Sequence, residues 1–356
     1  MAAAATPFRV AVVQRPPVLL NRDATIQRVV ESIDEAASEG ARLISFPEAY
    51  IPGYPEWIWR LRPGTDSGLT GEIHGALLNN AVDLSGNHLA PILAAARRHQ
   101  VTIVVSMDEL DGSFSRGTLY NTVVIISPNG EVLNRHRKLM PTNPERMVWG
   151  LGDASGLRVV ETAVGRVGAL ICWENFMPLA RYALYADGVQ LYVAPTWDMG
   201  SGWVSSMVHI AREGRCWVLG NGTSLQGRDI PADFPHRDVL FPDPDEWVNE
   251  GDSVIVAPNG TIAAGPLNKE HGILYAECDP ARSMRAHQTL DVAGHYSRPD
   301  VFRLEVVRES ADPITFRDRA PTAAAHASSV DNHVGSGGNS PKPPPPTKRS
   351  SQITNG

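Results

Sequence analysis

This chain of 356 residues has no long apolar run and no excess of basic over acidic residues. No apolar run approaches the roughly 20 residues that a membrane-spanning helix needs, so we expect no membrane partner. The net charge is -7 and no basic block precedes the tail, which argues against nucleic acid as a partner. The start, MAAAATPF, has no basic segment followed by a long apolar one, so it predicts no secretory signal.

Cysteine is also scarce. The chain has three, Cys172, Cys216 and Cys278, and they show no C-x-x-C spacing. An odd, scattered set argues against a disulfide scaffold and predicts a reducing, cytoplasmic setting. No His/Cys cluster has zinc spacing, and neither G-x-G-x-x-G nor G-x-x-x-x-G-K-[ST] occurs. We therefore expect no metal and no organic cofactor.

Short apolar runs alternate with amphipathic segments along most of the chain, and this alternation predicts an α/β protein. Strands are expected at 8–14, 43–46, 101–106, 167–171, 189–194, 216–220 and 273–278. Helices are expected before Gly40, with Asp23 or Thr25 as the cap, and at 89–99, 178–187 and 204–212. Pro-Asn-Gly at 128–130 and at 258–260 indicates two antiparallel ribbons. The Pro-, Gly- and Trp-rich segment 49–70 is expected to be a long loop that lines a site.

The composition changes at Pro321. Residues 321–356 have almost no large apolar side chain and many Pro, Ser and Gly residues. Such a segment cannot bury enough apolar surface to offset the entropy of ordering, so we expect a disordered tail.

Cys172 lies where a buried strand ends and a polar segment begins. Pro178 follows shortly after, at a position typical of the first turn of a helix. A thiol at the tip of such a turn is held on a rigid element, and a nearby helix N-terminus favours the thiolate. The alternative is a small core residue, which is the usual role of a cysteine that ends a buried strand.

Three charged residues complete a chemical set with this thiol. Glu48 ends the predicted strand LISF, Lys138 follows the hairpin in HRK, and Glu145 lies in PERMVW. Each alone has an ordinary interpretation as a helix cap, a solvated charge or a surface ion pair. Together they supply a base for the thiol, an ammonium for developing negative charge, and a second carboxylate to keep that ammonium charged.

Four motifs carry a resemblance to a known family. They are SFPEAYIPGYP around Glu48, HRKLMPT around Lys138, PTNPERMVWGLGD around Glu145 and CWENFMPLARYALYA from Cys172. With these motifs the chain resembles the nitrilase branch of the carbon–nitrogen hydrolase superfamily. The resemblance implies a Glu48-Lys138-Cys172 triad, with Glu145 as the family's second glutamate. One departure is Ala154 in GDASG, where we expect Gly.

The resemblance also implies an architecture: a four-layer α-β-β-α sandwich. It places an N-terminal extension at 1–7, the hydrolase domain at 8–304, a C-terminal extension at 305–320 and the tail at 321–356. Family members pair through their sheets and helices, so we expect a homo-oligomer built from dimers, larger than a dimer and helical in form.

The substrate is expected to be a small organic nitrile, aromatic or arylaliphatic, which is hydrolysed to the acid and ammonia. Aromatic residues that are candidates to line its pocket are Tyr54, Trp57, Trp59, Trp173 and Trp197. The sequence is equally consistent with these residues packing in the core or between subunits. Aliphatic nitriles remain open as substrates.

Other functions also remain open. The same triad serves aliphatic amidases and N-carbamoyl hydrolases. A serine hydrolase has weak support, because GTSLQG around Ser224 misplaces the last Gly of G-x-S-x-G. A binding protein that kept the fold, with its Pro-rich tail as a ligand, is the non-enzymatic alternative.

Overall fold

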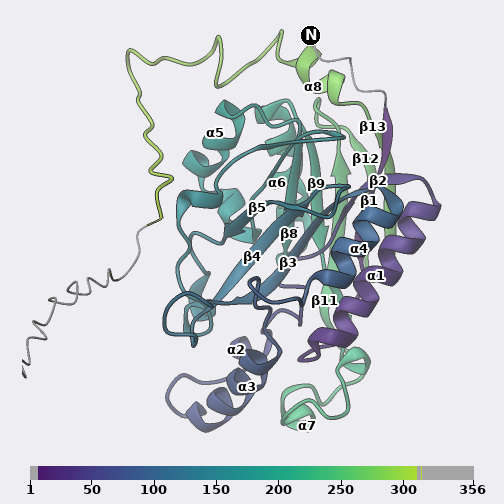
Figure 1. The fold of residues 1–356 in the computed structure, drawn as a ribbon, viewed down its shortest axis with the longest axis vertical. Coiled ribbons are helices and arrows are strands. Elements are labelled where there is room, and N and C mark those ends of the chain that lie inside the picture. The colour runs from purple at the N-terminus through teal and green to yellow at the C-terminus, as the bar shows by residue number, and fades with distance from the viewer. Residues whose placement is uncertain (1–6, 311–313, 315–356) are drawn as a thin grey trace, which may run out of the picture. The chain divides into compact units, whose positions relative to one another are not determined.

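Two mixed β-sheets form the centre of the fold in this computed structural model, which describes residues 7–310 and 314 (Figure 1). The first sheet has the order β13-β1-β2-β3-β4-β5, and β1, β2 and β3 run parallel. Its strands are β1 (Phe8–Gln14), β2 (Ala41–Ser45), β3 (Thr102–Leu110), β4 (Leu119–Ile126), β5 (Val132–Arg137) and β13 (Gly272–Cys278).

The second sheet has the order β10-β11-β9-β8-β7-β6, with β12 paired to β11 and with β7, β8 and β9 parallel. Its strands are β6 (Val160–Thr162), β7 (Gly165–Ala169), β8 (Leu191–Thr196), β9 (Trp217–Gly222), β10 (Ser224–Gln226), β11 (Trp247–Val256) and β12 (Ile262–Asn268). The helices are α1 (Arg22–Ser38), α2 (Trp57–Arg60), α3 (Ser67–Asn80), α4 (Ala90–His99), α5 (Pro178–Ala186), α6 (Ser201–Gly214), α7 (Arg237–Leu240) and α8 (Pro280–Ala286).

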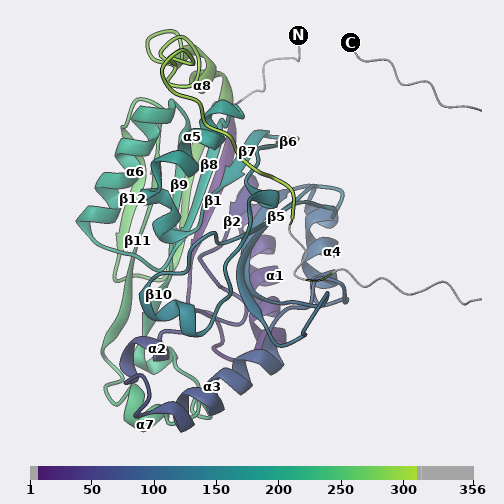
Figure 2. The same cartoon turned by 90° about the vertical axis from the view of Figure 1, so that its left-hand side faces the viewer.

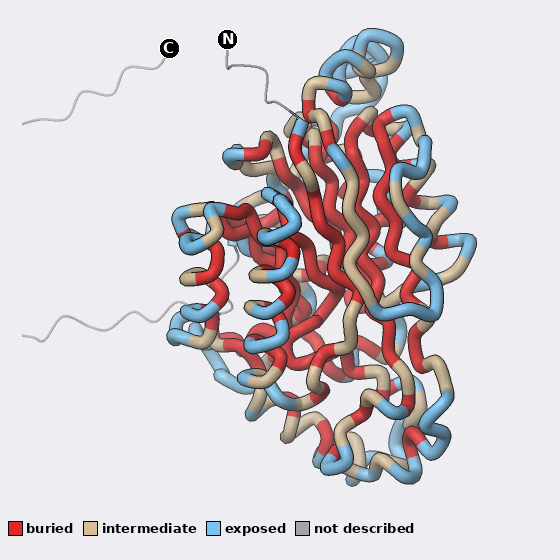
Figure 3. Tube along the Cα trace, turned by 90° about the vertical axis from the view of Figure 1, so that its right-hand side faces the viewer, coloured by how far each residue is buried: buried red, intermediate tan, exposed pale blue. Residues whose placement is uncertain are grey.

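The alternation of side chains along each strand creates the layers. In β1, Val10 and Val12 point into a core shared by both sheets, together with Val193 of β8. The residues between them, Ala11 and Val13, pack in a second core with α1 and α4. On the other side, α5 and α6 cover the second sheet. Figures 2 and 3 show this helix-sheet-sheet-helix order and the buried strands within it. The α-β-β-α sandwich is confirmed.

Two local expectations are wrong. The cap of α1 is neither Asp23 nor Thr25 but Asn21, whose side chain accepts a hydrogen bond from the Ala24 N–H at 3.0 Å. The expected loop 49–70 contains α2 and the start of α3. Burial of Trp57 and Ile58 in an apolar cluster stabilises α2, and this tertiary contact is invisible in a Pro-rich sequence window.

Both Pro-Asn-Gly ribbons are present: β4 pairs antiparallel with β5, and β11 with β12. No helix within 7–310 has the length and apolar character needed to cross a membrane. The tail at 321–356 and residues 1–6 lie outside the described residues. The oligomer built from dimers stays a prediction.

Candidate active site

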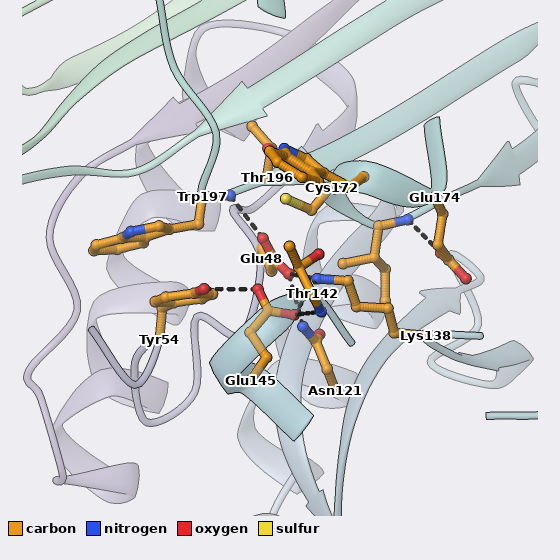
Figure 4. Close-up of polar contacts among 12 residues, drawn as sticks. Glu48, Tyr54, Asn121, Lys138, Thr142, Glu145, Cys172, Glu174, Thr196 and Trp197 are labelled. Carbon is orange, nitrogen blue, oxygen red and sulfur yellow. Dashed lines mark hydrogen bonds and ion pairs between the residues drawn. The ribbon is translucent and has the colours of Figure 1, made fainter. Parts of the chain in front are cut away.

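Glu48 follows β2, three residues beyond its last residue Ser45, and its carboxylate is buried. Its Oε1 accepts hydrogen bonds from Lys138 Nζ at 2.7 Å and Asn121 Nδ2 at 2.8 Å. Its Oε2 accepts one from the Trp197 backbone N–H at 2.6 Å (Figure 4). Burial raises the pKa of Glu48, and this effect outweighs the nearby ammonium of Lys138. A carboxylate held in this way has a fixed position and an increased affinity for a proton.

Lys138 follows β5 directly and lies between two carboxylates. Its Nζ donates to Glu48 Oε1 and to Glu145 Oε2, each at 2.7 Å. Burial alone would lower the pKa of Lys138, but Glu48, Cys172 and Glu145 outweigh it and raise the pKa. An ammonium has three donors. Within 7–310, hydrogen-bond acceptors for Nζ occupy two of these, so one N–H is available to a ligand.

Glu145 belongs to the 3₁₀ helix Asn143–Met147 and is fixed at both oxygens. Oε2 also accepts a hydrogen bond from the Thr142 backbone N–H at 2.6 Å, as part of a capping box. Oε1 accepts one from the Tyr54 hydroxyl at 2.6 Å. Glu145 therefore connects Lys138 to an aromatic side chain of the cavity wall.

Cys172 begins the 3₁₀ helix Cys172–Phe176 and has φ of +51°, in the left-handed region that non-glycine residues seldom adopt. Its sulfur faces Glu48 and Thr196 in Figure 4. Burial and the negative charge of Glu48 raise the pKa of the thiol. Lys138 and a contact with Thr196 oppose this shift, and the helix α5 begins only at Pro178. The influence of a helix N-terminus on the thiol stays a prediction.

Sequence analysis missed Glu174, which joins the lysine and cysteine segments. This buried carboxylate accepts hydrogen bonds from the backbone N–H of Leu139 and of Ile171, each at 2.6 Å. Both of its oxygens lie 3.0 Å from His136 Nε2. Burial raises the pKa of Glu174, but His136 and the two N–H donors outweigh burial and lower it. The only signal in the sequence was its place in the CWEN motif.

A cavity of about 300 Å³ opens onto the cysteine. Its lining consists of Tyr54, Glu56, Trp59, Thr142, Glu145, Cys172, Trp173, Trp197, Asp198, Met199 and Val248. The rings of Tyr54 and Trp197 stack with centroids 4.3 Å apart, and this pair forms one apolar wall.

Four of the five expected aromatic residues, Tyr54, Trp59, Trp173 and Trp197, lie in this lining. Trp57 does not: its side chain is 2% exposed and packs in a cluster with Ile73 and Leu77 of α3. The helical turn of α2 directs Trp57 inward and Trp59 toward the cavity. Sequence analysis also missed Glu56, Asp198, Met199 and Val248, because no local pattern places them beside the thiol.

Residues 9–288 match the model of the family described as carbon-nitrogen hydrolase. The chain belongs to the carbon-nitrogen hydrolase family. Nitrilase 1 of Arabidopsis thaliana is 41% identical over 328 residues, which cover 88% of this chain and 91% of the relative. An aliphatic nitrilase of Sinorhizobium fredii is 40% identical over 88% of this chain and 99% of its own. These relatives place this carbon-nitrogen hydrolase in the nitrilase branch.

Solved structures support the same fold for this carbon-nitrogen hydrolase. Nit3 of Saccharomyces cerevisiae, described as a member of branch 10 of the nitrilase superfamily, superposes with a TM-score of 0.64. The match covers 83% of this chain and 98% of that protein, at 19% identity.

The serine of GTSLQG lies outside the cavity lining. Ser224 is fully buried, and its Oγ lies 2.6 Å from His271 Nδ1, while His271 Nε2 lies 3.3 Å from Asp229. This is a serine-histidine-aspartate contact, but a substrate has no access to the hydroxyl. The contact ties β10 to the turn before β13 and gives no support to a serine hydrolase. Among the described residues, no group of three His, Cys, Asp or Glu side chains is arranged to hold a metal ion.

Proposed function

We propose that this carbon-nitrogen hydrolase converts an organic nitrile and two waters to a carboxylic acid and ammonia, through a covalent bond to Cys172. The relatives named nitrilases, at about 40% identity over most of both chains, support the reaction. The observation that supports the residues is the buried chain of contacts from Glu48 through Lys138 to Glu145, next to a thiol that lines the cavity.

In the first half-reaction, Glu48 takes the proton of Cys172 and the sulfur adds to the nitrile carbon. One electron pair of the triple bond moves to nitrogen, which takes the proton back from Glu48 and gives a neutral thioimidate. The free N–H of Lys138 stabilises the negative charge on nitrogen before it is protonated. The raised pKa of Glu48 suits this role, because a base that later returns its proton needs a proton affinity near that of the group it serves.

In the second half-reaction, one water adds to the thioimidate carbon and the carbon–nitrogen bond breaks. Ammonia leaves and a thioester remains on Cys172. A second water attacks the thioester, the carbon–sulfur bond breaks, and the acid departs as the thiol regains a proton. Glu48 passes both protons of the first water to nitrogen, which leaves as ammonia, and one proton of the second water to the sulfur. Glu145 keeps Lys138 charged and in place throughout.

We also propose that the substrate carries one aromatic ring. The stacked pair of Tyr54 and Trp197, with Trp59 and Trp173, gives flat apolar walls suited to a ring. A volume of about 300 Å³ lies at the lower end of the range for small-molecule sites, which favours a single ring over a larger system. The relative named an aliphatic nitrilase makes short aliphatic nitriles the competing substrates.

Ammonia release from a panel of aromatic, arylaliphatic and aliphatic nitriles tests the proposal, with the corresponding amides and N-carbamoyl amino acids beside them. The Cys172→Ala variant is expected to release no ammonia from any nitrile while it keeps the wild-type unfolding midpoint. Mass spectrometry of wild-type enzyme quenched during turnover is expected to show an acyl adduct on Cys172. Wild-type ammonia release by Cys172→Ala would refute the covalent role.

A further inference from the structure

A fourth carboxyl group lies in the cavity wall, and the proposed mechanism does not use it. Glu56 precedes α2, lines the cavity with Cys172, and has a side chain that is 14% exposed. Its Oε2 accepts a hydrogen bond from Trp197 Nε1 at 3.0 Å. Its Oε1 accepts no hydrogen bond from residues 7–310. The nearest cationic atom, Arg60 Nε, is 3.6 Å away.

The neighbouring arginine, Arg60, makes its hydrogen bonds to other groups. Arg60 donates to both oxygens of Glu246, at 2.7 and 3.1 Å, and to the Leu240 carbonyl at 2.8 Å. Its guanidinium also lies over the Phe241 ring, 4.5 Å from the centroid. Arg60 Nε itself makes no hydrogen bond to any described residue. One guanidinium thus faces two carboxylates: it is hydrogen-bonded to Glu246 and forms a longer ion pair with Glu56, so its single positive charge is shared between them.

Trp197 places the carboxylate of Glu56 relative to the reacting atoms. Its backbone N–H donates to Glu48, and its indole N–H donates to Glu56. The two carboxylates are therefore held at opposite ends of one tryptophan, Glu48 beside the thiol and Glu56 along the wall. The described lining also contains Asp198 and four aromatic residues, but no Lys, Arg or His. A wall with acidic groups and aromatic faces attracts cations and repels anions.

We propose that Glu56 determines substrate choice by accepting a hydrogen bond, at its free Oε1, from an ammonium group on the end of the substrate remote from the nitrile. The favoured substrates are then aromatic nitriles that carry a protonated amine on a ring substituent. This inference rests on the proposed nitrile hydrolysis and names the substrate class of the same cavity. Glu56 acts in binding only, since Glu48 and Lys138 perform the chemistry.

The alternative is that Glu56 only orients Trp197. In that case a change at residue 56 would alter the hydrolysis of charged and uncharged nitriles equally, because the position of Trp197 affects both. The two roles therefore differ in a ratio of kcat/KM values between matched substrates.

Three para-substituted benzonitriles make the comparison. The probe is 4-(aminomethyl)benzonitrile, its uncharged isostere is 4-ethylbenzonitrile, and 4-cyanophenylacetate carries the opposite charge. For the wild-type enzyme we expect kcat/KM to be about tenfold higher for the ammonium than for the isostere, the difference that one charge-assisted hydrogen bond makes. The carboxylate is expected to be the poorest substrate of the three.

The variant Glu56→Gln keeps the size of the side chain and removes its charge. We expect it to lose the roughly tenfold preference for the ammonium over 4-ethylbenzonitrile, and an unfolding midpoint equal to that of the wild type shows that the variant is folded. Glu131→Gln is the matched control, because it removes the same charge from an exposed hairpin turn. It is expected to keep the wild-type preference.

The pH dependence gives a second readout. Burial raises the pKa of Glu56 to about 7, with Arg60 and Trp197 opposing the shift and Glu246 adding to it. The preference for the ammonium is therefore expected to grow from about pH 6 to about pH 8 as Glu56 loses its proton. The ratio to 4-ethylbenzonitrile cancels the titration of the catalytic groups. In Glu56→Gln the ratio is expected to stay flat.

The outcomes separate the two proposals. Ammonia from none of the nitriles would overturn the proposed function. Ammonia from both matched substrates with equal kcat/KM, or a preference that survives Glu56→Gln, would overturn the role of Glu56 and leave nitrile hydrolysis standing. An equal fall in kcat/KM for both substrates in Glu56→Gln would show that Glu56 only orients Trp197, and would also overturn the inference.

Discussion

Replacement of Glu174 by glutamine tests whether one buried carboxylate sets the distance between the lysine and the cysteine. In the wild-type protein each oxygen of Glu174 accepts one backbone N–H and lies 3.0 Å from His136 Nε2. The two N–H groups belong to Leu139 and Ile171, which adjoin Lys138 and Cys172 in the chain. A carboxylate is the only side chain of this size with two acceptor oxygens.

The expected loss of stability follows from the two backbone N–H groups that donate to Glu174. In glutamine one oxygen becomes an NH₂ group, so in either orientation a donor faces the N–H of Leu139 or of Ile171. One buried N–H without an acceptor costs about 1–3 kcal/mol, and the remaining hydrogen bonds lose their ionic contribution. We therefore expect Glu174→Gln to lower the free energy of unfolding by about 2–4 kcal/mol. Since the orphaned group adjoins Lys138 or Cys172, kcat is expected to fall about 100-fold, the effect of a misplacement of roughly 1 Å.

The assay pairs urea unfolding with nitrile hydrolysis at a temperature where both proteins are fully folded. Asp34→Asn is the matched control. Asp34 contacts His99 at 2.7 Å on the outer face of α1 and α4, remote from the cavity. Its partial exposure limits the expected loss to about 1 kcal/mol, with kcat unchanged. Wild-type stability and turnover in Glu174→Gln would refute the reasoning, and a loss of stability with wild-type kcat would refute the positioning role.

Three further predictions follow from the site. Lys138→Met is expected to lower kcat about 100- to 1000-fold, measured by ammonia release, because it removes the donor to the developing anion; a loss below tenfold would contradict this role. Tyr54→Phe is expected to lower kcat/KM about tenfold, since Glu145 Oε1 loses its hydroxyl donor, whereas unchanged kinetics would show that Thr142 alone fixes Glu145. The pKa of Glu174 is lowered, so its contribution to stability is present above its unfolded pKa of about 4.3 and is lost as pH falls through the folded pKa. Urea unfolding across this acid range is expected to show a steeper loss for wild type than for Glu174→Gln, and parallel curves would contradict the assignment.

The strands were the most predictable part of the fold. β1 was expected at 8–14 and has these bounds, because its central residues, Val10 to Val13, form an apolar run between Arg9 and Gln14 and are buried on both faces. The hairpins were equally predictable from Pro-Asn-Gly, since turn chemistry is local. The helix α2 was missed because Pro55 and Gly53 dominate its sequence window. Its stability comes from burial of Trp57 and Ile58 in a cluster whose other members include Trp149 and Phe241, which are distant from that window in the chain.

For the site, the motifs picked out four residues that the fold brings together, but they contain no information on what those residues touch. Glu56 and Val248 enter the cavity from segments nearly 200 residues apart, and only the stacking of two sheets relates them. The surroundings of Cys172 could not be predicted for a similar reason. A helix N-terminus can be inferred from neighbouring residues, whereas the burial and the carboxylate that raise the pKa of the thiol depend on elements distant in the chain.

The reacting groups are divided between the two sheets. Glu48 and Lys138 follow β2 and β5 of the first, while Cys172 and Trp197 follow β7 and β8 of the second. A refolding intermediate in which each sheet has formed but the pair has not yet docked would have native secondary structure and no turnover. Turnover therefore requires that the interior faces of the two sheets are docked, so activity reports on the contact between the sheets as well as on the site itself.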